Sequence, residues 1–321
     1  MQLSREDLLK AYRRMVMIRE FEEAVHEEFS AGSIPGFVHL YAGEEASGVG
    51  VCMHLNDNDY IASTHRGHGH CLAKDCDEHA MMLEIFGKKD GLCGGKGGSM
   101  HIADLSKGMM GANGIVGGGP PLICGAALTA KTLKNGGVAV AFVGDGASNQ
   151  GTVFESYNLA KVWNLPAIFV VEDNGYAEAT SSKYSVAGSQ VNRGKAFDIP
   201  AVEVDGSDFF AVWEAAREAV ERARNGGGPS LIHSRVLRYY GHFEGDAMTY
   251  RPADEVANYR ANKDPLMLFR RRVTEAGLLE GSALDEIDRS VKDRIAQCVV
   301  QAKSAPEPTE ADLLTDVYIS Y

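Results

Sequence analysis

Two stretches near the middle of the chain are apolar at almost every position. They are VAVAFVGDG, residues 138–146, and AIFVVEDN, residues 167–174. Continuous apolar runs of this length are typical of parallel strands that helices cover on both faces, whereas half-exposed strands alternate apolar and polar residues. Residues 152–165, between the two runs, have the spacing of an amphipathic helix. The pattern therefore predicts a strand–helix–strand unit with two parallel strands.

The same pattern extends over the rest of the chain. Helical spacing is found at residues 4–30, where Ser4 can cap the first turn, and at 43–55, 79–91, 121–137, 208–225, 264–279 and 283–304. Further strands are expected at 201–206 and 230–239, and a short strand that runs into a loop at 59–74. Residues 91–119 are rich in glycine and predict a long loop, and residues 177–199 predict a polar mobile or interface loop.

Strands that alternate with helices indicate the α/β class. We expect a doubly wound, mostly parallel sheet flanked by helices, with a helical C-terminal region. The chain of 321 residues is long enough for one large domain, and no internal boundary or repeat is evident, so a single domain over 1–321 is expected.

Composition narrows the range of partners. The net charge is -12, which argues against a nucleic-acid or anionic-membrane partner, because both require a basic face. The six cysteines form no Cys-x-x-Cys pair, so we expect reduced thiols in a cytoplasmic protein. The N-terminal segment lacks the apolar core of a signal peptide, and no apolar run approaches the length of a membrane span.

Polar residues gather where each of the two central strands ends. Asp145, between two glycines, follows the first strand, and Asn174 follows the second. Parallel strands end at the same edge of a sheet, which is where such sheets bind ligands. A carboxylate oxygen and an amide oxygen are hard donors suited to Mg²⁺ or Ca²⁺. The amides of Gly146 and Ala147 lead into the helix expected from about Gly151, and such amides attract phosphate. These residues predict a metal–diphosphate site.

The segment GDGASNQG…VVEDNGY resembles the signature of enzymes that bind thiamine diphosphate, and other motifs occur in the order of one family. These motifs are GFVHLYAGEEA, THRGHGH, GGKGGSMH, GANGIVG, FESYNLA and IPAVEVDG. The chain is thereby similar to the alpha subunits of acetoin and 2-oxo acid dehydrogenase complexes, from about Tyr12 to Asp254, and most similar to the acetoin type. The resemblance implies the thiamine diphosphate-binding fold, with thiamine diphosphate and Mg²⁺ as cofactors.

The resemblance also implies roles for single residues. Asp145, Asn174 and the backbone carbonyl of Tyr176 would bind the metal, and the amides of Gly146 and Ala147 would contact the diphosphate. The relatives often carry a second asparagine where this chain has Asp173. Because the metal ligand matches the later position of the pair, we expect the site to be intact.

Other residues that the resemblance assigns lie outside these strand ends. Arg66 and His242 would contact the phosphates, and Gly114 and Val116 would lie along the cofactor rings. His242, His65 and His39 are the candidate catalytic residues on the substrate side. A histidine metal cluster at His65, His68 and His70 is the weaker alternative for the THRGHGH segment.

Two possible regulatory or nucleotide functions are not expected. Regulated relatives carry a phosphorylatable serine directly after the histidine, and this chain has Phe243 there. The stretch GGKGGS, residues 94–99, lacks the spacing of a nucleoside triphosphate loop, and no Gly-x-Gly-x-x-Gly follows a first strand.

The implied reaction cleaves acetoin to acetaldehyde and a hydroxyethyl adduct of the cofactor, which a lipoyl acyltransferase component takes up. Thiamine chemistry needs a carboxylic acid beside the aminopyrimidine ring. No glutamate of this chain matches that acid, so a beta subunit is expected to supply it in an α2β2 heterotetramer. The alternatives are a pyruvate dehydrogenase alpha subunit, a branched-chain 2-oxo acid enzyme, and a non-catalytic relative that binds the cofactor.

Overall fold

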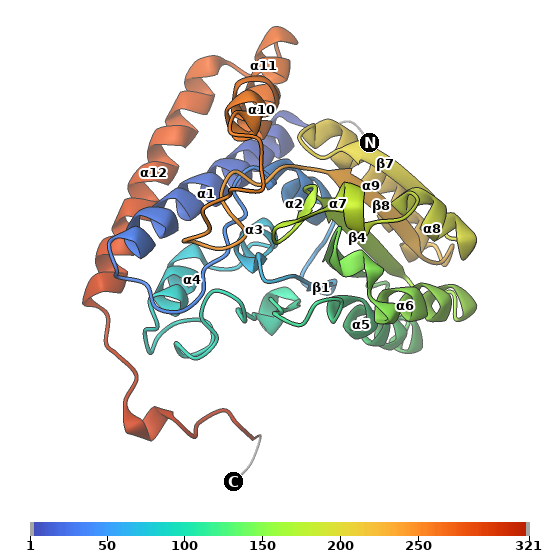
Figure 1. The fold of residues 1–321 in the computed structure, drawn as a ribbon, viewed down its shortest axis with the longest axis horizontal. Coiled ribbons are helices and arrows are strands. Elements are labelled where there is room, and N and C mark those ends of the chain that lie inside the picture. The colour runs from blue at the N-terminus through green and yellow to red at the C-terminus, as the bar shows by residue number, and fades with distance from the viewer. Residues whose placement is uncertain (1–2, 319–321) are drawn as a thin grey trace.

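The structure is a computed structural model that describes residues 3–318. Its centre is a sheet of six parallel strands in the order β2–β1–β3–β4–β8–β7, with helices on both faces (Figure 1). The strands are β1 (Tyr60–Ala62), β2 (Met109–Gly111), β3 (Ala139–Gly144), β4 (Ala167–Asp173), β7 (Ala201–Asp205) and β8 (Ser230–Arg235). The expected α/β fold with a mostly parallel sheet is confirmed.

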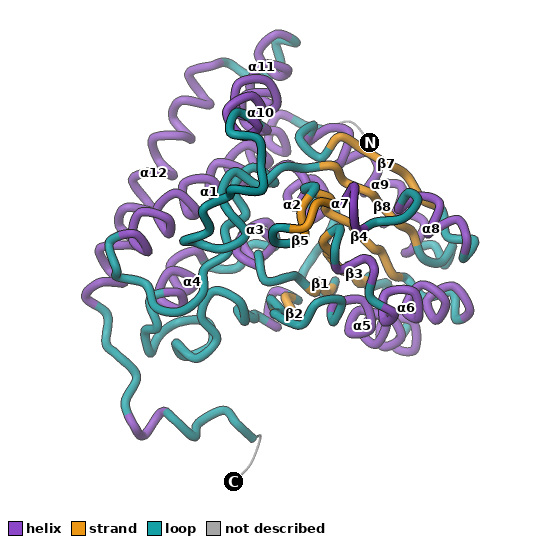
Figure 2. Tube along the Cα trace, in the orientation of Figure 1, coloured by secondary structure: helices purple, strands orange, loops and turns teal. Residues whose placement is uncertain are grey.

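Two groups of helices cover the sheet (Figure 2). The helices over one face are α1 (Arg5–Ser30), α2 (Glu45–Cys52), α3 (Gly67–Ala73), α4 (Glu78–Ile85), α9 (Phe209–Arg224), α11 (Pro265–Glu275) and α12 (Gly281–Ser304). The helices over the other face are α5 (Gly119–Leu133), α6 (Gly151–Val162) and α8 (Gln190–Ala196). The long helices α1 and α12 lie side by side at one end of the molecule (Figure 1).

The central strand β3 shows why the sheet needs cover on both faces. Val140 and Phe142 belong to the core under α2 and α9, whereas Ala139, Ala141 and Val143 belong to the core under α5 and α6. All five side chains are almost completely buried. Burial of a large apolar side chain contributes about 1.5–3 kcal/mol, so both helical layers stabilise this strand.

The prediction of a loop over the end of residues 59–74 was wrong. The chain forms β1 and then the helix α3, every residue of which is buried. Glycine and histidine are poor helix formers. Here the glycines permit close packing, because a Cβ added to Gly69 would lie 1.9 Å from Cδ1 of Tyr41. Tertiary packing outweighs the weak local preference.

Two other stretches hold more structure than predicted. The glycine-rich residues 91–119 contain the edge strand β2 and a short 3₁₀ helix at Leu105–Lys107. The polar residues 177–199 take part in the hairpin of β5 (Tyr176–Ala177) and β6 (Thr180–Ser181), and contain α7 (Ser182–Ser185) and α8. The helix α10 (Glu255–Lys263) was missed altogether; it has no fully buried residue and therefore no clear apolar face.

The ends of the described chain agree with the helical patterns found there. Ser4 caps α1, and its hydroxyl accepts a hydrogen bond from the amide of Asp7, as predicted. A 3₁₀ helix at Glu310–Asp312 lies in the C-terminal tail that extends beyond α12 (Figure 1). Within residues 3–318, no helix combines the length and apolarity that crossing a membrane requires.

Candidate active site

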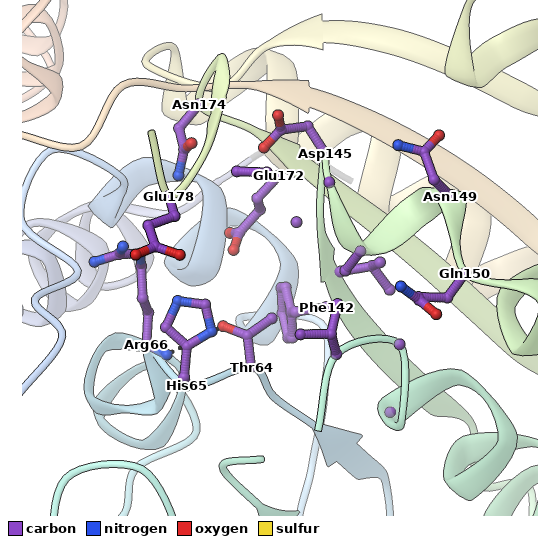
Figure 3. A pocket seen from close by; sticks show the side chains of 18 of the residues that line it. Thr64, His65, Arg66, Phe142, Asp145, Asn149, Gln150, Glu172, Asn174 and Glu178 are labelled. Atoms are coloured by element: carbon purple, nitrogen blue, oxygen red, sulfur yellow. Dashed lines mark hydrogen bonds between the residues drawn. The ribbon is translucent and has the colours of Figure 1, made fainter. Parts of the chain in front are cut away.

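A cavity of about 410 Å³ opens at the carboxyl ends of β3 and β4. Asp145, Glu172 and Asn174 come from these strand ends on one side of it, and Thr64, His65 and Arg66 face them from the segment before α3 (Figure 3). The predicted site residues that line this cavity are His65, Arg66, Val116, Asp145, Gly146, Ala147, Asn174, Tyr176 and His242. Residues from distant parts of the sequence therefore meet at the predicted edge of the sheet.

Asp145 presents a buried carboxylate to the cavity. The residue is only 2% exposed, and Oδ2 has no hydrogen-bond partner among the described residues. Burial, and after it the charge of Asp173, raises the pKa of Asp145 to about 6. A buried carboxylate oxygen without a partner is unfavourable unless a ligand or cation binds it. This is the environment expected of a metal ligand.

Asn174 lies at the end of the neighbouring strand. Its Nδ2 donates a hydrogen bond of 2.9 Å to Oε1 of Glu44, and its Oδ1 accepts a long one of 3.3 Å from the amide of Tyr176. Asp173 is held elsewhere, because its Oδ2 lies 3.0 Å from Nε2 of His233. Of the two adjoining side chains, it is therefore Asn174 that lines the cavity, as expected.

Glycine is required after Asp145 for packing. A Cβ added to Gly146 would lie 2.3 Å from the Cβ of Ala177 in the β5–β6 hairpin. The turn then passes through a 3₁₀ helix at Ala147–Asn149 into α6, which begins at Gly151 as predicted. The turn brings the backbone of Gly146 and Ala147 to the wall of the cavity.

Backbone carbonyl groups hold the side chain of Arg66 in the cavity wall. Its guanidinium donates hydrogen bonds to the carbonyl oxygens of Leu40, at 2.9 Å, and His242, at 2.6 Å. Burial, and then the neighbouring Arg238, lowers the pKa of Arg66 to about 10, so it stays charged at neutral pH. Among the described residues that line the cavity, Arg66 is the one permanent cation.

The predicted histidines form a triangle beside Arg66. The ring centroids of His39 and His65 are 4.6 Å apart. The centroid of His242 lies 5.1 Å from that of His39 and 5.0 Å from that of His65. Burial and the charge of Arg66 lower the pKa of His39 to about 3 and of His242 to about 4, and also lower the pKa of His65. All three rings are therefore neutral at pH 7. His65 and His242 line the cavity, whereas His39 contacts both of them but is not part of the wall.

The alternative cluster of His65, His68 and His70 does not form. His68 bonds Glu22 and Ser99, and His70 bonds Ser63. In the described part of the chain, the group of three that could share a metal ion is instead His39, His65 and His242. His68 and His70 belong to the buried packing of α3.

Comparison with known proteins identifies the family. Residues 13–311 match the family model of the dehydrogenase E1 component. The chain is 64% identical to the alpha subunit of acetoin:2,6-dichlorophenolindophenol oxidoreductase from Cupriavidus necator and 56% identical to that from Bacillus subtilis, each alignment covering 99% of this chain and 96% of the relative. The chain belongs to the dehydrogenase E1 component family.

A more distant relative is the pyruvate dehydrogenase E1 component subunit alpha of Rhizobium meliloti, which is 42% identical over 99% of this chain and 92% of the relative. The predicted resemblance, and its greater strength toward the acetoin type, are therefore confirmed. Membership of the E1 component family implies thiamine diphosphate as the cofactor.

The cavity of this E1 component chain fits that cofactor and a divalent cation. Asp145 and Asn174 offer oxygen donors, and Arg66 offers a charge for phosphate. Val116 and Phe142 supply apolar walls for flat rings. Gly114, which was predicted to contact the rings, is not part of the wall, although Asn113 and Ile115 on either side of it are.

Three acidic residues of the cavity wall were not predicted as site residues: Glu44, Glu172 and Glu178. Glu172 is fixed by the hydroxyl of Tyr41 and by His70, whose Nε2 is 3.1 Å away. Burial, and then Glu172, raises the pKa of Glu44 to about 8. Glu44 was not predicted because the GEEA motif that contains it reads as the start of a helix. That a beta subunit supplies the acid beside the aminopyrimidine ring stays a prediction.

The GGKGGS stretch has an internal function that explains its glycines. The buried carboxylate of Glu84 accepts hydrogen bonds of 2.7–3.0 Å from the amides of Cys93, Gly95, Gly97 and Gly98. The amides that would cradle a phosphate are therefore occupied by a side chain of α4. This agrees with the rejection of a nucleotide loop.

Proposed function

We propose that this chain is the alpha subunit of a thiamine diphosphate-dependent dehydrogenase component that cleaves acetoin. The products are acetaldehyde and a two-carbon unit, which passes to the lipoyl group of an acyltransferase component. The observation that carries the proposal is the cavity that joins Asp145, Asn174 and Arg66 in a chain 64% identical to an acetoin oxidoreductase alpha subunit.

Each cavity group has a role in this proposal. Asp145, Asn174 and the carbonyl of Tyr176 would hold Mg²⁺, and Arg66 and the amides of Gly146 and Ala147 would bind phosphate oxygens. Thiamine diphosphate, when bound, would supply carbanion chemistry at the substrate carbonyl.

The histidines form the substrate side of the cavity. His65 and His242 are neutral and can exchange hydrogen bonds with a hydroxyl or carbonyl oxygen, and His39 packs against them. Arg66, the permanent cation of the described cavity wall, is assigned to the diphosphate, so that wall offers no second permanent charge for a substrate carboxylate. That arrangement favours a neutral hydroxyketone over a 2-oxo acid.

We further propose that a beta subunit completes the site, in an assembly of two alpha and two beta subunits. The relatives at 64% and 56% identity are named alpha subunits, which supports a second kind of subunit. The cavity is open at the strand ends, and Ile115 beside it is 74% exposed. A cytoplasmic location remains part of this proposal.

The test is an assay of the reconstituted alpha–beta pair with 2,6-dichlorophenolindophenol as electron acceptor. We expect kcat/KM to be at least about 10-fold higher for acetoin than for pyruvate, a difference of about 1.4 kcal/mol in transition-state binding. A preference for pyruvate would instead assign the chain to the pyruvate dehydrogenase branch of the family. The chain is 42% identical to a member of that branch. Cofactor binding without turnover of either substrate would support the non-catalytic alternative.

A further inference from the structure

Glu44 occupies the position that caps α2, but its side chain does not cap the helix. Short polar side chains are preferred there because they reach the first free amides. The longer side chain of Glu44 instead extends to the cavity, where Oε1 accepts the hydrogen bond of 2.9 Å from Nδ2 of Asn174. Glu44 is 1% exposed, so this bond is formed away from bulk water.

The backbone beneath Glu44 is fixed from both sides. Gly43 has a φ of +101°, and a Cβ added there would lie 2.2 Å from the carbonyl oxygen of Leu237. Its amide donates a 3.0 Å hydrogen bond to Oε1 of Glu45, which also accepts one of 2.6 Å from Nε of Arg19. The start of α2 therefore has little freedom, and the carboxylate of Glu44 is held at a set place beside Asn174.

An asparagine amide has two chemically different ends, and the partner of one end decides which way the other points. The carboxyl group of Glu44 keeps an accepting oxygen whether or not it is protonated, and in the structure Oε1 accepts its hydrogen bond from the Nδ2 end of Asn174. The Oδ1 end is then left for the cavity, where its one partner among the described residues is the distant amide of Tyr176. With the amide reversed, Asn174 would present hydrogen atoms to a cation and could not ligate it.

We infer that Glu44 is a positioning residue that holds the amide of Asn174 with its oxygen toward the metal site at Asp145, and that it thereby sets the affinity for Mg²⁺. The inference rests on the proposed function, since it needs a metal at that site. In the described structure, Glu44 is the residue that receives the Nδ2 hydrogen bond. Glu172, the neighbouring carboxylate, instead accepts a hydrogen bond from the hydroxyl of Tyr41 and lies 3.1 Å from Nε2 of His70.

Two variants separate the hydrogen bond from the acidic group. Glu44→Asp keeps a carboxyl group but is one methylene shorter, so its oxygen no longer reaches Nδ2. Glu44→Gln loses the acidic group but keeps an oxygen at the same reach. The quantity measured is the Mg²⁺ concentration that gives half-maximal binding of thiamine diphosphate to the alpha–beta complex. Titration calorimetry detects the binding.

We expect Glu44→Asp to raise this Mg²⁺ concentration about 10- to 100-fold, the usual effect of losing a residue that orients a metal ligand. Glu44→Gln is expected to raise it by less than about 3-fold, because the orienting bond survives. Glu178→Gln, which removes one charge from the same cavity wall without touching Asn174, is the matched control and should leave the value unchanged.

An aspartate variant with the wild-type Mg²⁺ dependence would overturn the inference. A glutamine variant as impaired as the aspartate variant would also overturn it, because the acidic group rather than the orientation of Asn174 would then be the cause. Thermal unfolding without cofactor verifies that each variant folds, and Glu44→Ala replaces the aspartate variant if that one does not. A wild-type complex that binds thiamine diphosphate without Mg²⁺, or not at all, would instead refute the proposed function.

Discussion

The carboxylate of Asp145 illustrates how a single residue can serve a ligand at the expense of the empty protein. It is buried, one oxygen has no partner among the described residues, and burial raises its pKa to about 6. A side chain selected for stability alone would be apolar or hydrogen-bonded in this place. Function and stability are therefore expected to respond in opposite directions to its replacement.

Asp145→Asn should abolish Mg²⁺-dependent thiamine diphosphate binding, because the amide cannot provide the anionic ligand. The same change should stabilise the cofactor-free chain by about 1–2 kcal/mol, since a neutral amide is cheaper to bury than an unpaired carboxylate. Calorimetry measures the first effect and urea unfolding at pH 7.5 the second. Asp173→Asn is the control: it breaks a 3.0 Å contact with His233 and should destabilise the chain. If both substitutions lowered stability equally, this interpretation of Asp145 would be wrong.

His39 should make the stability of the chain sensitive to acid. Its ring packs against His65 and His242, with His68, Arg66 and Arg238 nearby. Burial, and then the charge of Arg66, lowers its pKa to about 3. The unfolded chain, in which histidine has a pKa near 6.5, binds a proton that the folded chain refuses. The contribution of neutral His39 to the free energy of unfolding is therefore fully present above about pH 6.5, and it is lost as the pH decreases toward 3.

Urea unfolding at pH 7 and pH 5 measures this contribution. The wild-type chain should lose about 1–2 kcal/mol more over this interval than the His39→Gln variant, whose side chain does not titrate. An identical loss in both chains would show that His39 is protonated without penalty in the folded state.

At the scale of elements, the packing of helix α3 depends on its glycines, although glycine has a low helix propensity. Gly67 and Gly69 lie where added Cβ atoms would be 2.4 Å from the Cβ of Ala112 and 1.9 Å from Cδ1 of Tyr41. The hydroxyl of Tyr41 in turn holds Glu172 at the cavity. The close approach of α3 to Tyr41 therefore connects core packing with the position of a cavity carboxylate.

Gly69→Ala should destabilise the chain by about 1–3 kcal/mol, because the buried ring of Tyr41 must move. Gly125→Ala in α5 is the matched comparison, since an added Cβ there meets nothing within 4 Å. It should stabilise the isolated chain by about 0.5–1 kcal/mol through better helix propensity. Urea unfolding of both variants provides the measurement. A stabilising Gly69→Ala would show that the packing around α3 is looser than described.

At the scale of the whole molecule, the cavity edge has the character of a surface that another protein covers. Ile115 is 74% exposed and Val116 is 57% exposed, and both belong to the cavity wall. Large apolar side chains beside an open site are typical of binding surfaces. We therefore expect the proposed beta subunit to contact this edge.

Ile115→Asp should weaken association with the beta subunit by at least about 10-fold, because it places a charge in an apolar contact. The stability of the isolated chain should change by less than about 0.5 kcal/mol, since the side chain is already exposed. Analytical ultracentrifugation of the mixed subunits measures the association. Unchanged association would place the beta subunit elsewhere on the surface.

The sequence by itself determined the strands that form the centre of the sheet and the residues at their ends. The apolar runs of β3 and β4 are local patterns, and the rule that parallel strands end at one edge placed Asp145 and Asn174 together. The order of the motifs determined the family for the same reason, because it is a property of the chain and needs no contact between distant residues.

The tertiary structure alone decided which distant residues share the cavity. Glu44 meets Asn174 across 130 positions of sequence, and His39 and His65 meet His242 near the opposite end of the chain. It also decided that α3 is a helix and that α8, within residues 177–199, packs against β7 and β8. These outcomes depend on burial and on contacts between separate elements, and such contacts leave no periodic signal in the segments that form them.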